Sequence, residues 1–216
     1  MGYMENFMRD KKSALLGVLL MSCAGGVFAG PNLSVRGSIE PVSCVPSFAS
    51  PVLDFGSLSF PEKKGGEVFR VPSKTVGFAL SCSSAISLAF SFDDLRKSSV
   101  SESAGGTPGF NFGLGMQGDH KIGYYDVLAK NITLDGNAGE LLASNDGGLV
   151  WRRNSTGIVL APLVYSFVVT GGGADPGSYR EYAGDIEVSP FVGYAGVDLT
   201  KPLELDGAIV MNVKYI

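Results

Sequence analysis

Residues 75–92 read TVGFALSCSSAISLAFSF, and this stretch decides the fold class. Large apolar residues occupy every second position in each half of it: Val76, Phe78 and Leu80, then Ile86, Leu88, Phe90 and Phe92. An alternation with a period of two is typical of β-strands that bury one face and expose the other. The stretch therefore predicts two consecutive strands, at residues 75–81 and 85–92.

Similar short patterns recur on both sides of this stretch, separated by the Gly, Pro, Ser and Asp residues that favour turns. They predict further strands at residues 32–39, 53–56, 67–71, 110–114, 122–129, 149–151, 158–170, 183–192 and 208–216. Residues 97–108 are predicted to form an exposed loop, and residues 138–143 one helical turn. Many short strands without a long helical pattern predict an all-β sandwich or barrel.

The composition fits one globular domain and argues against several classes of function. Among 216 residues, 45% are hydrophobic and 18% are charged, and the net charge is −4. A negatively charged chain has no general attraction for the phosphates of nucleic acids. The chain has a single histidine, His120, which argues against histidine-based catalysis and against a metal site with several histidine ligands. The sequence therefore predicts no enzyme, no catalytic residue, no cofactor, no metal site and no nucleic-acid partner.

Some patterns that resemble binding sites are interpreted as ordinary structure. Residues 113–118 match the G-x-G-x-x-G spacing of dinucleotide-binding loops, but the residues that follow lack the helical character that such a site requires. His120 lies just beyond, in a glycine-rich turn. Several aromatic residues are interpreted as core or cross-strand partners rather than as a carbohydrate platform: Tyr124, Tyr125, Trp151, Tyr179 and Tyr182.

The N-terminus has the pattern of a secretory signal peptide. Basic residues precede an apolar run at residues 14–21, and small residues follow, ending at Ala29. The run is much shorter than the roughly 20 residues that span a bilayer as a helix. Residues 1–29 are therefore predicted to be a signal peptide cleaved between Ala29 and Gly30, leaving residues 30–216 as a single domain. The stretch Leu20–Cys23 also resembles the lipobox of bacterial lipoproteins, so lipidation of Cys23 is an alternative.

Two cysteines lie outside the signal peptide, Cys44 and Cys82. An even number of cysteines in an exported chain predicts a disulfide. A metal site made of cysteines alone would need more than two of them. We therefore expect one disulfide, between Cys44 and Cys82.

Several stretches together resemble the subunits of bacterial chaperone–usher fimbriae. Residues 35–44 resemble the first strand of such pilins, which leads into the first cysteine, and residues 78–82 resemble the strand that carries the second. Residues 208–216, with the penultimate Tyr215, resemble the terminal motif of pilins. Shorter pieces are similar to a pilin-like family of unknown function found beside chaperone and usher genes: residues 54–56, 112–115, 121–124 and 146–151.

The resemblance implies an immunoglobulin-like Greek-key β-sandwich that is incomplete because it lacks its final strand. In such subunits a periplasmic chaperone fills the open groove first, and the N-terminal extension of the next subunit then replaces it, which is a form of β-augmentation. By this resemblance, alternating residues of the terminal strand line the groove and bind the chaperone or donor strand: Ile209, Met211, Val213 and Tyr215. The implied partners are the chaperone, the outer-membrane usher, other fimbrial subunits and a host receptor or glycan.

Residues 32–39 have two interpretations within this resemblance. Alternating positions of this segment point one way: Leu33, Val35, Gly37 and Ile39. If the segment is the first strand of the domain, the subunit can accept a donor strand but hardly give one. If it is the donated strand, the first strand of the domain must begin near Cys44.

The leading functional hypothesis is a non-enzymatic structural or accessory subunit of a surface fimbria that supports adhesion, exported through the periplasm to the cell surface. A tip adhesin is an alternative within this class. A second class is a self-contained periplasmic or outer-membrane binding domain, lipidated through Cys23 if the lipobox is used. A secreted enzyme that uses His120 is a third.

Overall fold

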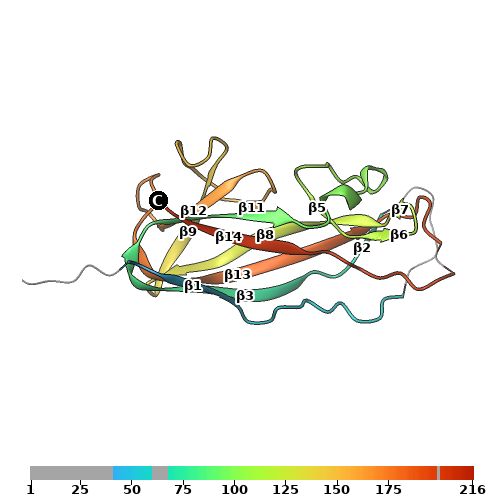
Figure 1. Ribbon diagram of the computed structural model, residues 1–216, viewed down its shortest axis with the longest axis horizontal. Coiled ribbons are helices and arrows are strands. Elements are labelled where there is room, and N and C mark those ends of the chain that lie inside the picture. The colour runs from blue at the N-terminus through green and yellow to red at the C-terminus, as the bar shows by residue number, and fades with distance from the viewer. Residues whose placement is uncertain (1–40, 60–67, 199) are drawn as a thin grey trace, which may run out of the picture. The chain divides into compact units, whose positions relative to one another are not determined.

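The structure is a computed structural model that describes residues 41–59, 68–198 and 200–216. Its main strands follow one antiparallel path that folds into two layers (Figure 1). The first layer holds, in spatial order, β1 (Cys44–Phe48), β3 (Lys74–Ile86), β13 (Tyr179–Val192) and β8 (Gly123–Leu134). A hairpin leads from β8 to the second layer, which holds β9 (Asn137–Ser144), β12 (Val164–Val169), β4 (Leu88–Asp94) and β14 (Ile209–Tyr215).

Shorter elements extend these layers. Two-residue strands lie beside the longer ones: β2 (Phe69–Arg70) beside β13, β5 (Phe112–Gly113) and β11 (Ile158–Val159) beside β8, and β10 (Arg152–Arg153) beside β9. A separate small hairpin joins β6 (Met116–Gln117) and β7 (His120–Lys121). The 3-10 helices are η1 (Lys97–Ser99) and η2 (Glu102–Ala104).

The strand order confirms the predicted fold class. The consecutive strands β3 and β4 lie in different layers, and the late strand β13 lies between β3 and β8. This is the Greek-key order of an immunoglobulin-like β-sandwich. Within the described residues, β1 and β14 each pair with a single neighbour, so they form the two ends of the path. The sandwich formed by the described residues is therefore incomplete between β1 and β14.

The stretch at residues 75–92 supplies the centre of the core. It falls in β3 and β4, and its alternating residues are buried: Val76, Phe78, Leu80, Leu88, Phe90 and Phe92. The ring of Phe90 stacks on that of Phe167, from β12, with centroids 4.9 Å apart. Phe78 approaches the same ring from the opposite layer, at 6.1 Å. Aromatic rings from both layers therefore hold the sandwich together.

Cys44 and Cys82 form a disulfide, as the cysteine count predicts. The two residues are direct partners in the register of β1 and β3. The bond therefore fastens the edge strand β1 to the first layer at the first residue of the strand.

The helical turn predicted at residues 138–143 is wrong, because these residues lie in β9. The preceding residues Asp135 and Gly136 have φ of 47° and 79°. Two consecutive residues with positive φ make a tight turn that matches the twist of a hairpin, so β8 continues directly into β9. Leu141 and Leu142 are both buried there, which hides the alternation expected of a strand.

Other predicted boundaries also differ from the structure. Residues 97–108 are mostly exposed, as predicted, but they include η1 and η2 and bury Val100 and Ala104. Residues 53–56 and 149–151 form no strand. Residues 158–170 break into β11 and β12 around Pro162, since a proline has no N–H for a ladder.

Some predictions fall on residues outside the described part of the chain. These are the signal peptide at residues 1–29, cleavage between Ala29 and Gly30, lipidation of Cys23, and the strand at residues 32–39. The alternating residues of that strand, Leu33, Val35, Gly37 and Ile39, lie outside it as well.

Candidate functional site

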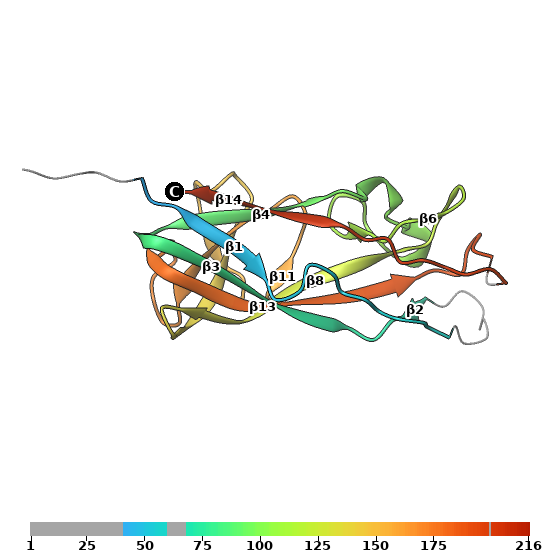
Figure 2. The ribbon, with the colours of Figure 1, turned by 60° about the horizontal axis from the view of Figure 1, so that its bottom comes forward.

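The gap between the free edges of β1 and β14, called the seam below, is the candidate site. Figure 2 shows the start of β1 close to the end of β14, with the two strands splaying apart from there. At the close end, the backbone N–H of Cys44 donates a hydrogen bond of 2.9 Å to the hydroxyl of Tyr215. At the splayed end, Phe48 and Ile209 line one hollow. The two strands therefore run in opposite directions across the seam.

The free edge of β14 offers unpaired backbone groups above an apolar surface. Hydrogen bonds to β4 flank the strand, with Leu95 N–H donating to the carbonyl of Ala208. Because backbone groups alternate in an antiparallel ladder, the seam receives those of the odd-numbered residues: Ile209, Met211 and Val213. Within the described residues these groups pair with no second strand. The three side chains are half-buried and pack against the core.

The free edge of β1 offers fewer free backbone hydrogen-bonding groups than that of β14. The backbone groups of Ser43 and Ala49, on either side of the strand, both bond to β3. By the same alternation, Cys44, Pro46 and Phe48 direct their backbone groups toward the seam. The first N–H is taken by the tyrosine hydroxyl and the second does not exist in a proline. A further strand would therefore find its hydrogen bonds mainly on β14.

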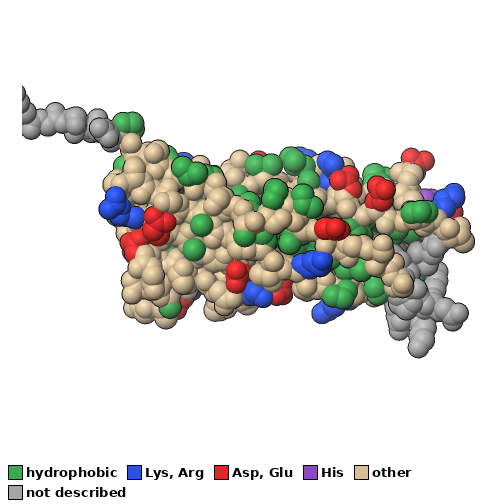
Figure 3. Space-filling view, turned by 90° about the horizontal axis from the view of Figure 1, so that it is seen from below, with side chains coloured by type: hydrophobic (Ala, Val, Ile, Leu, Met, Phe, Trp, Pro, Cys, Tyr) green, Lys and Arg blue, Asp and Glu red, His purple; other side chains and the backbone are tan. Residues whose placement is uncertain are grey.

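The hollow at the splayed end is apolar and measures about 370 Å³. Leu114, Tyr125, Ile186 and Val188 contribute to its lining, and none of the lining residues carries a charge. Figure 3 looks onto this side of the domain, and hydrophobic side chains gather across the middle of the face. An apolar concavity beside an unpaired strand edge fits an extended chain with large apolar side chains.

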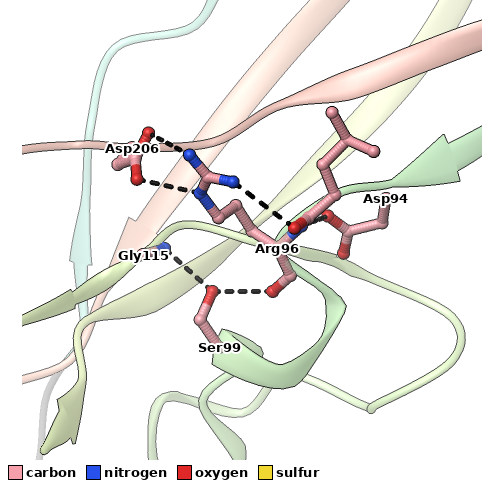
Figure 4. Close-up of polar contacts among 6 residues, drawn as sticks. Asp94, Arg96, Ser99, Gly115 and Asp206 are labelled. Carbon is pink, nitrogen blue, oxygen red and sulfur yellow. Dashed lines mark hydrogen bonds and ion pairs between the residues drawn. The ribbon is translucent and has the colours of Figure 1, made fainter.

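An ion pair holds the segment that enters β14 (Figure 4). The guanidinium of Arg96 donates to both carboxylate oxygens of Asp206, at 2.8 and 3.1 Å. The backbone N–H of Asp206 also donates to the carbonyl of Leu114, at 2.9 Å. Ser99 supports this arrangement, since its hydroxyl donates to the carbonyl of Arg96 and accepts from the N–H of Gly115. These contacts fix the rim of the hollow.

The ion pair should stabilise the domain only above the acid range. The hydrogen bond from Arg96 lowers the pKa of Asp206 below its ordinary value of 3.8. A carboxylate of this kind contributes stability above its unfolded pKa and loses it as the pH falls through the folded pKa. We expect Asp206→Asn to lower the Tm at pH 7, by at most about 2 °C because the pair is exposed. Far-UV circular dichroism melts at pH 7 and well below pH 3.8 check this; a difference that persists in acid contradicts it.

The hydroxyl of Tyr215 has a structural role that a phenylalanine variant tests. The side chain is 45% exposed, so its contribution comes mainly from the hydrogen bond to Cys44 rather than from burial. We expect Tyr215→Phe to lower the free energy of unfolding by about 1 kcal/mol. This corresponds to a fall in Tm of about 3 °C for a domain of this size. Identical melting curves for the two proteins would show that the two edges are not held together by this contact.

The structure brings most of the predicted groove residues to one edge. Ile209, Met211 and Val213 lie in β14 with their backbone groups toward the seam, and Tyr215 closes its narrow end. Sequence reasoning placed a first strand near Cys44 in only one of its two interpretations of residues 32–39, and it missed both the role of β1 as the opposite edge and the hollow. The signal for β1 was Pro46 within the short stretch from Cys44 to Phe48, because a proline inside a strand favours an edge position.

The G-x-G-x-x-G stretch and His120 both lie in or beside short strands. Residues 113–118 lead from β5 into the β6–β7 hairpin and are followed by no helix. A Cβ on Gly113 would lie 1.9 Å from the carbonyl oxygen of Arg96, so this glycine serves close packing. His120 is exposed in β7.

Two of the aromatic residues are core members, as predicted. Tyr125 and Tyr182 are buried, and burial raises the pKa of Tyr182 to about 12. Tyr124 stacks face to face on Phe191 of the neighbouring β13, with centroids 4.8 Å apart. A tyrosine that stacks across strands serves sheet pairing.

In the described part of the chain, no cluster of three or more His, Cys, Asp or Glu side chains could hold a metal ion. The same residues include no helix long and apolar enough to cross a membrane. No family model matches the sequence. No curated protein matches it significantly.

Proposed function

We propose that this chain is a structural or accessory subunit of a bacterial surface fimbria, assembled by donor-strand complementation through a chaperone–usher pathway and supporting adhesion. The observation that carries the proposal is the seam. The backbone groups of Ile209, Met211 and Val213 face it without a partner strand in the described residues, beside an apolar hollow. A strand laid against β14 would complete the second layer and cover the core.

The physical reason for a partner lies in the exposed edge. An open apolar strand edge pairs readily with other chains, so an exported protein that carries one needs a strand to cover it. In the proposed pathway a periplasmic chaperone supplies that strand first, and another subunit supplies it after delivery to the outer-membrane usher. The other surfaces of the sandwich then remain available to a host receptor or glycan. The proposal assigns the chain no reaction and requires no cofactor.

A self-contained periplasmic or outer-membrane binding domain is the second candidate, anchored through Cys23 if that residue is lipidated. The hydrogen bond between Cys44 and Tyr215 favours it, because this bond joins the two edges without any partner strand. Such a domain would be a stable monomer after export. The two candidates therefore differ in the oligomeric state of the exported chain.

The deciding experiment examines the surface of the producing cells. Material sheared from the cells is run on a denaturing gel without boiling and probed for this chain. We expect a ladder of multimers that collapses to a monomer on boiling, because strand-exchanged subunits resist detergent until they are heated. A single monomer band confined to the periplasm or outer membrane would reject the fimbrial proposal.

A further inference from the structure

We infer that the loop between β9 and β10, residues 145–151, docks the domain on the surface of a phospholipid bilayer. Its tip consists of Leu149 and Val150, which are 85% and 54% exposed. Apolar side chains gathered on a surface mark sites of contact with another protein or with a membrane. The inference goes beyond the proposed function and is independent of the seam. The loop adjoins β9, in the middle of the strand path, whereas the seam lies between the two ends of that path.

Hydrogen bonds within the loop hold the tip in place. One carboxylate oxygen of Asp146 accepts from the backbone N–H groups of Leu149 and Val150, both at 3.0 Å. The hydroxyl of Ser144 donates to the same oxygen and accepts from the N–H of Gly148. An N–H that loses water without gaining a partner is costly, and these donors already have partners. The two apolar side chains can therefore enter the acyl region while the backbone stays at the level of the headgroups.

Trp151 packs against the loop next to the tip. Gly147 and Gly148 have φ of 78° and 100°, so the chain turns sharply just before Leu149. A Cβ on Gly148 would lie 3.2 Å from the indole ring of Trp151, so this glycine allows the ring to pack closely. The tryptophan remains partly exposed. An indole combines a large apolar body with one N–H donor, and it favours the boundary between hydrocarbon and headgroups.

The cation at the base of the loop is available to a lipid phosphate. Arg152, the first residue of β10, is exposed, and none of the ion pairs among the described residues includes it. The neighbouring Arg153, by contrast, pairs with Glu140. A guanidinium binds phosphate oxygens through two parallel N–H groups. Along the chain, the apolar tip, the indole and this guanidinium follow the order of hydrocarbon, interface and phosphate in a lipid leaflet.

An apolar hollow continues the surface beside the tip. Val150 lines this hollow together with Phe110 and Ile158, which are 48% and 46% exposed, and the hollow measures about 570 Å³. Its charged lining residues are Arg152 and Arg153, and no carboxylate lines it. Apolar surface combined with positive charge complements a phospholipid, in which phosphates lie above apolar chains.

The fluorescence of Trp151 tests the inference directly, because it is the only tryptophan of the chain. The exported chain is purified with its disulfide intact and mixed with phosphatidylcholine vesicles. We expect the emission maximum to move to shorter wavelength as lipid is added. We also expect at least twofold quenching by lipids that carry bromine atoms near the headgroup end of their acyl chains. Unchanged emission at millimolar lipid would overturn the inference and leave the tip to a protein partner.

A pair of leucine variants provides the matched control in vesicle co-sedimentation. We expect Leu149→Asp to bind at least tenfold more weakly than the wild-type chain, and its exposure means that the variant should fold normally. Leu95 lies outside the loop and is 57% exposed, so Leu95→Asp should bind like the wild type. Equal binding by all three proteins would contradict the inference. Vesicle binding needs no second subunit, so its absence leaves the fimbrial proposal intact, and the absence of a multimer ladder leaves this inference intact.

Discussion

Replacing Met211 by aspartate should remove the chain from surface multimers. The side chain is half-buried against the core and the backbone groups of the residue face the seam. A carboxylate at this position would have to be buried when a strand fills the seam, at a cost of several kcal/mol. Because each 1.4 kcal/mol is about tenfold in affinity, we expect at least a hundredfold loss of strand binding.

The matched control for this change lies on the same strand. Val210 is 43% exposed and its backbone groups face β4 rather than the seam. We expect Val210→Asp to assemble like the wild-type chain. The unboiled gel of sheared material provides the measurement, with the periplasmic amount of each variant as a check on folding. Equal ladders from the two variants would show that β14 is not the edge that receives the strand.

Removing the disulfide should have the largest effect on the stability of the domain. The bond joins residues 38 positions apart, and closing a loop of this length stabilises by about 4 kcal/mol in the chain-entropy model. We expect the double variant Cys44→Ser and Cys82→Ser to lose about this amount. Removing the disulfide would also affect the seam. The disulfide fastens β1 at Cys44, and the backbone of Cys44 also contacts Tyr215.

Equilibrium unfolding in urea, followed by circular dichroism, measures this loss. The wild-type protein with reductant provides a second route to the same state, and the two should unfold at the same denaturant concentration. A midpoint for the double variant equal to that of the oxidised wild-type protein would contradict the expectation.

The strands whose faces differ in polarity could be predicted from the sequence. In β3, Val76, Phe78 and Leu80 point into the core while their neighbours point away, so the pattern is visible locally. The strand β9 could not be found in this way, because Leu141 and Leu142 are both buried. Its strand conformation depends on the tight turn at Asp135 and Gly136 and on pairing with β12, and the second of these joins residues far apart in the chain.

Only one edge of the seam, β14, could be predicted from the sequence. The alternation of β14 marked Met211 and Val213, although their role came from a resemblance rather than from the pattern itself. The hollow is assembled from segments far apart in the chain, including Leu114, Tyr125 and Ile186, and no local pattern connects them. That β1 forms the other edge follows from its pairing with β3 alone, which only the folded structure provides.

The hydrogen bond from Cys44 to Tyr215 makes the seam sensitive to the length of whatever enters it. A strand that pairs only as far as Val213 leaves the bond intact. A longer strand gains one more backbone partner on β14 but must break the bond first, and the two contributions nearly cancel. Extra residues in the inserted strand would therefore add little affinity. The domain thus limits the length over which an inserted strand gains binding energy.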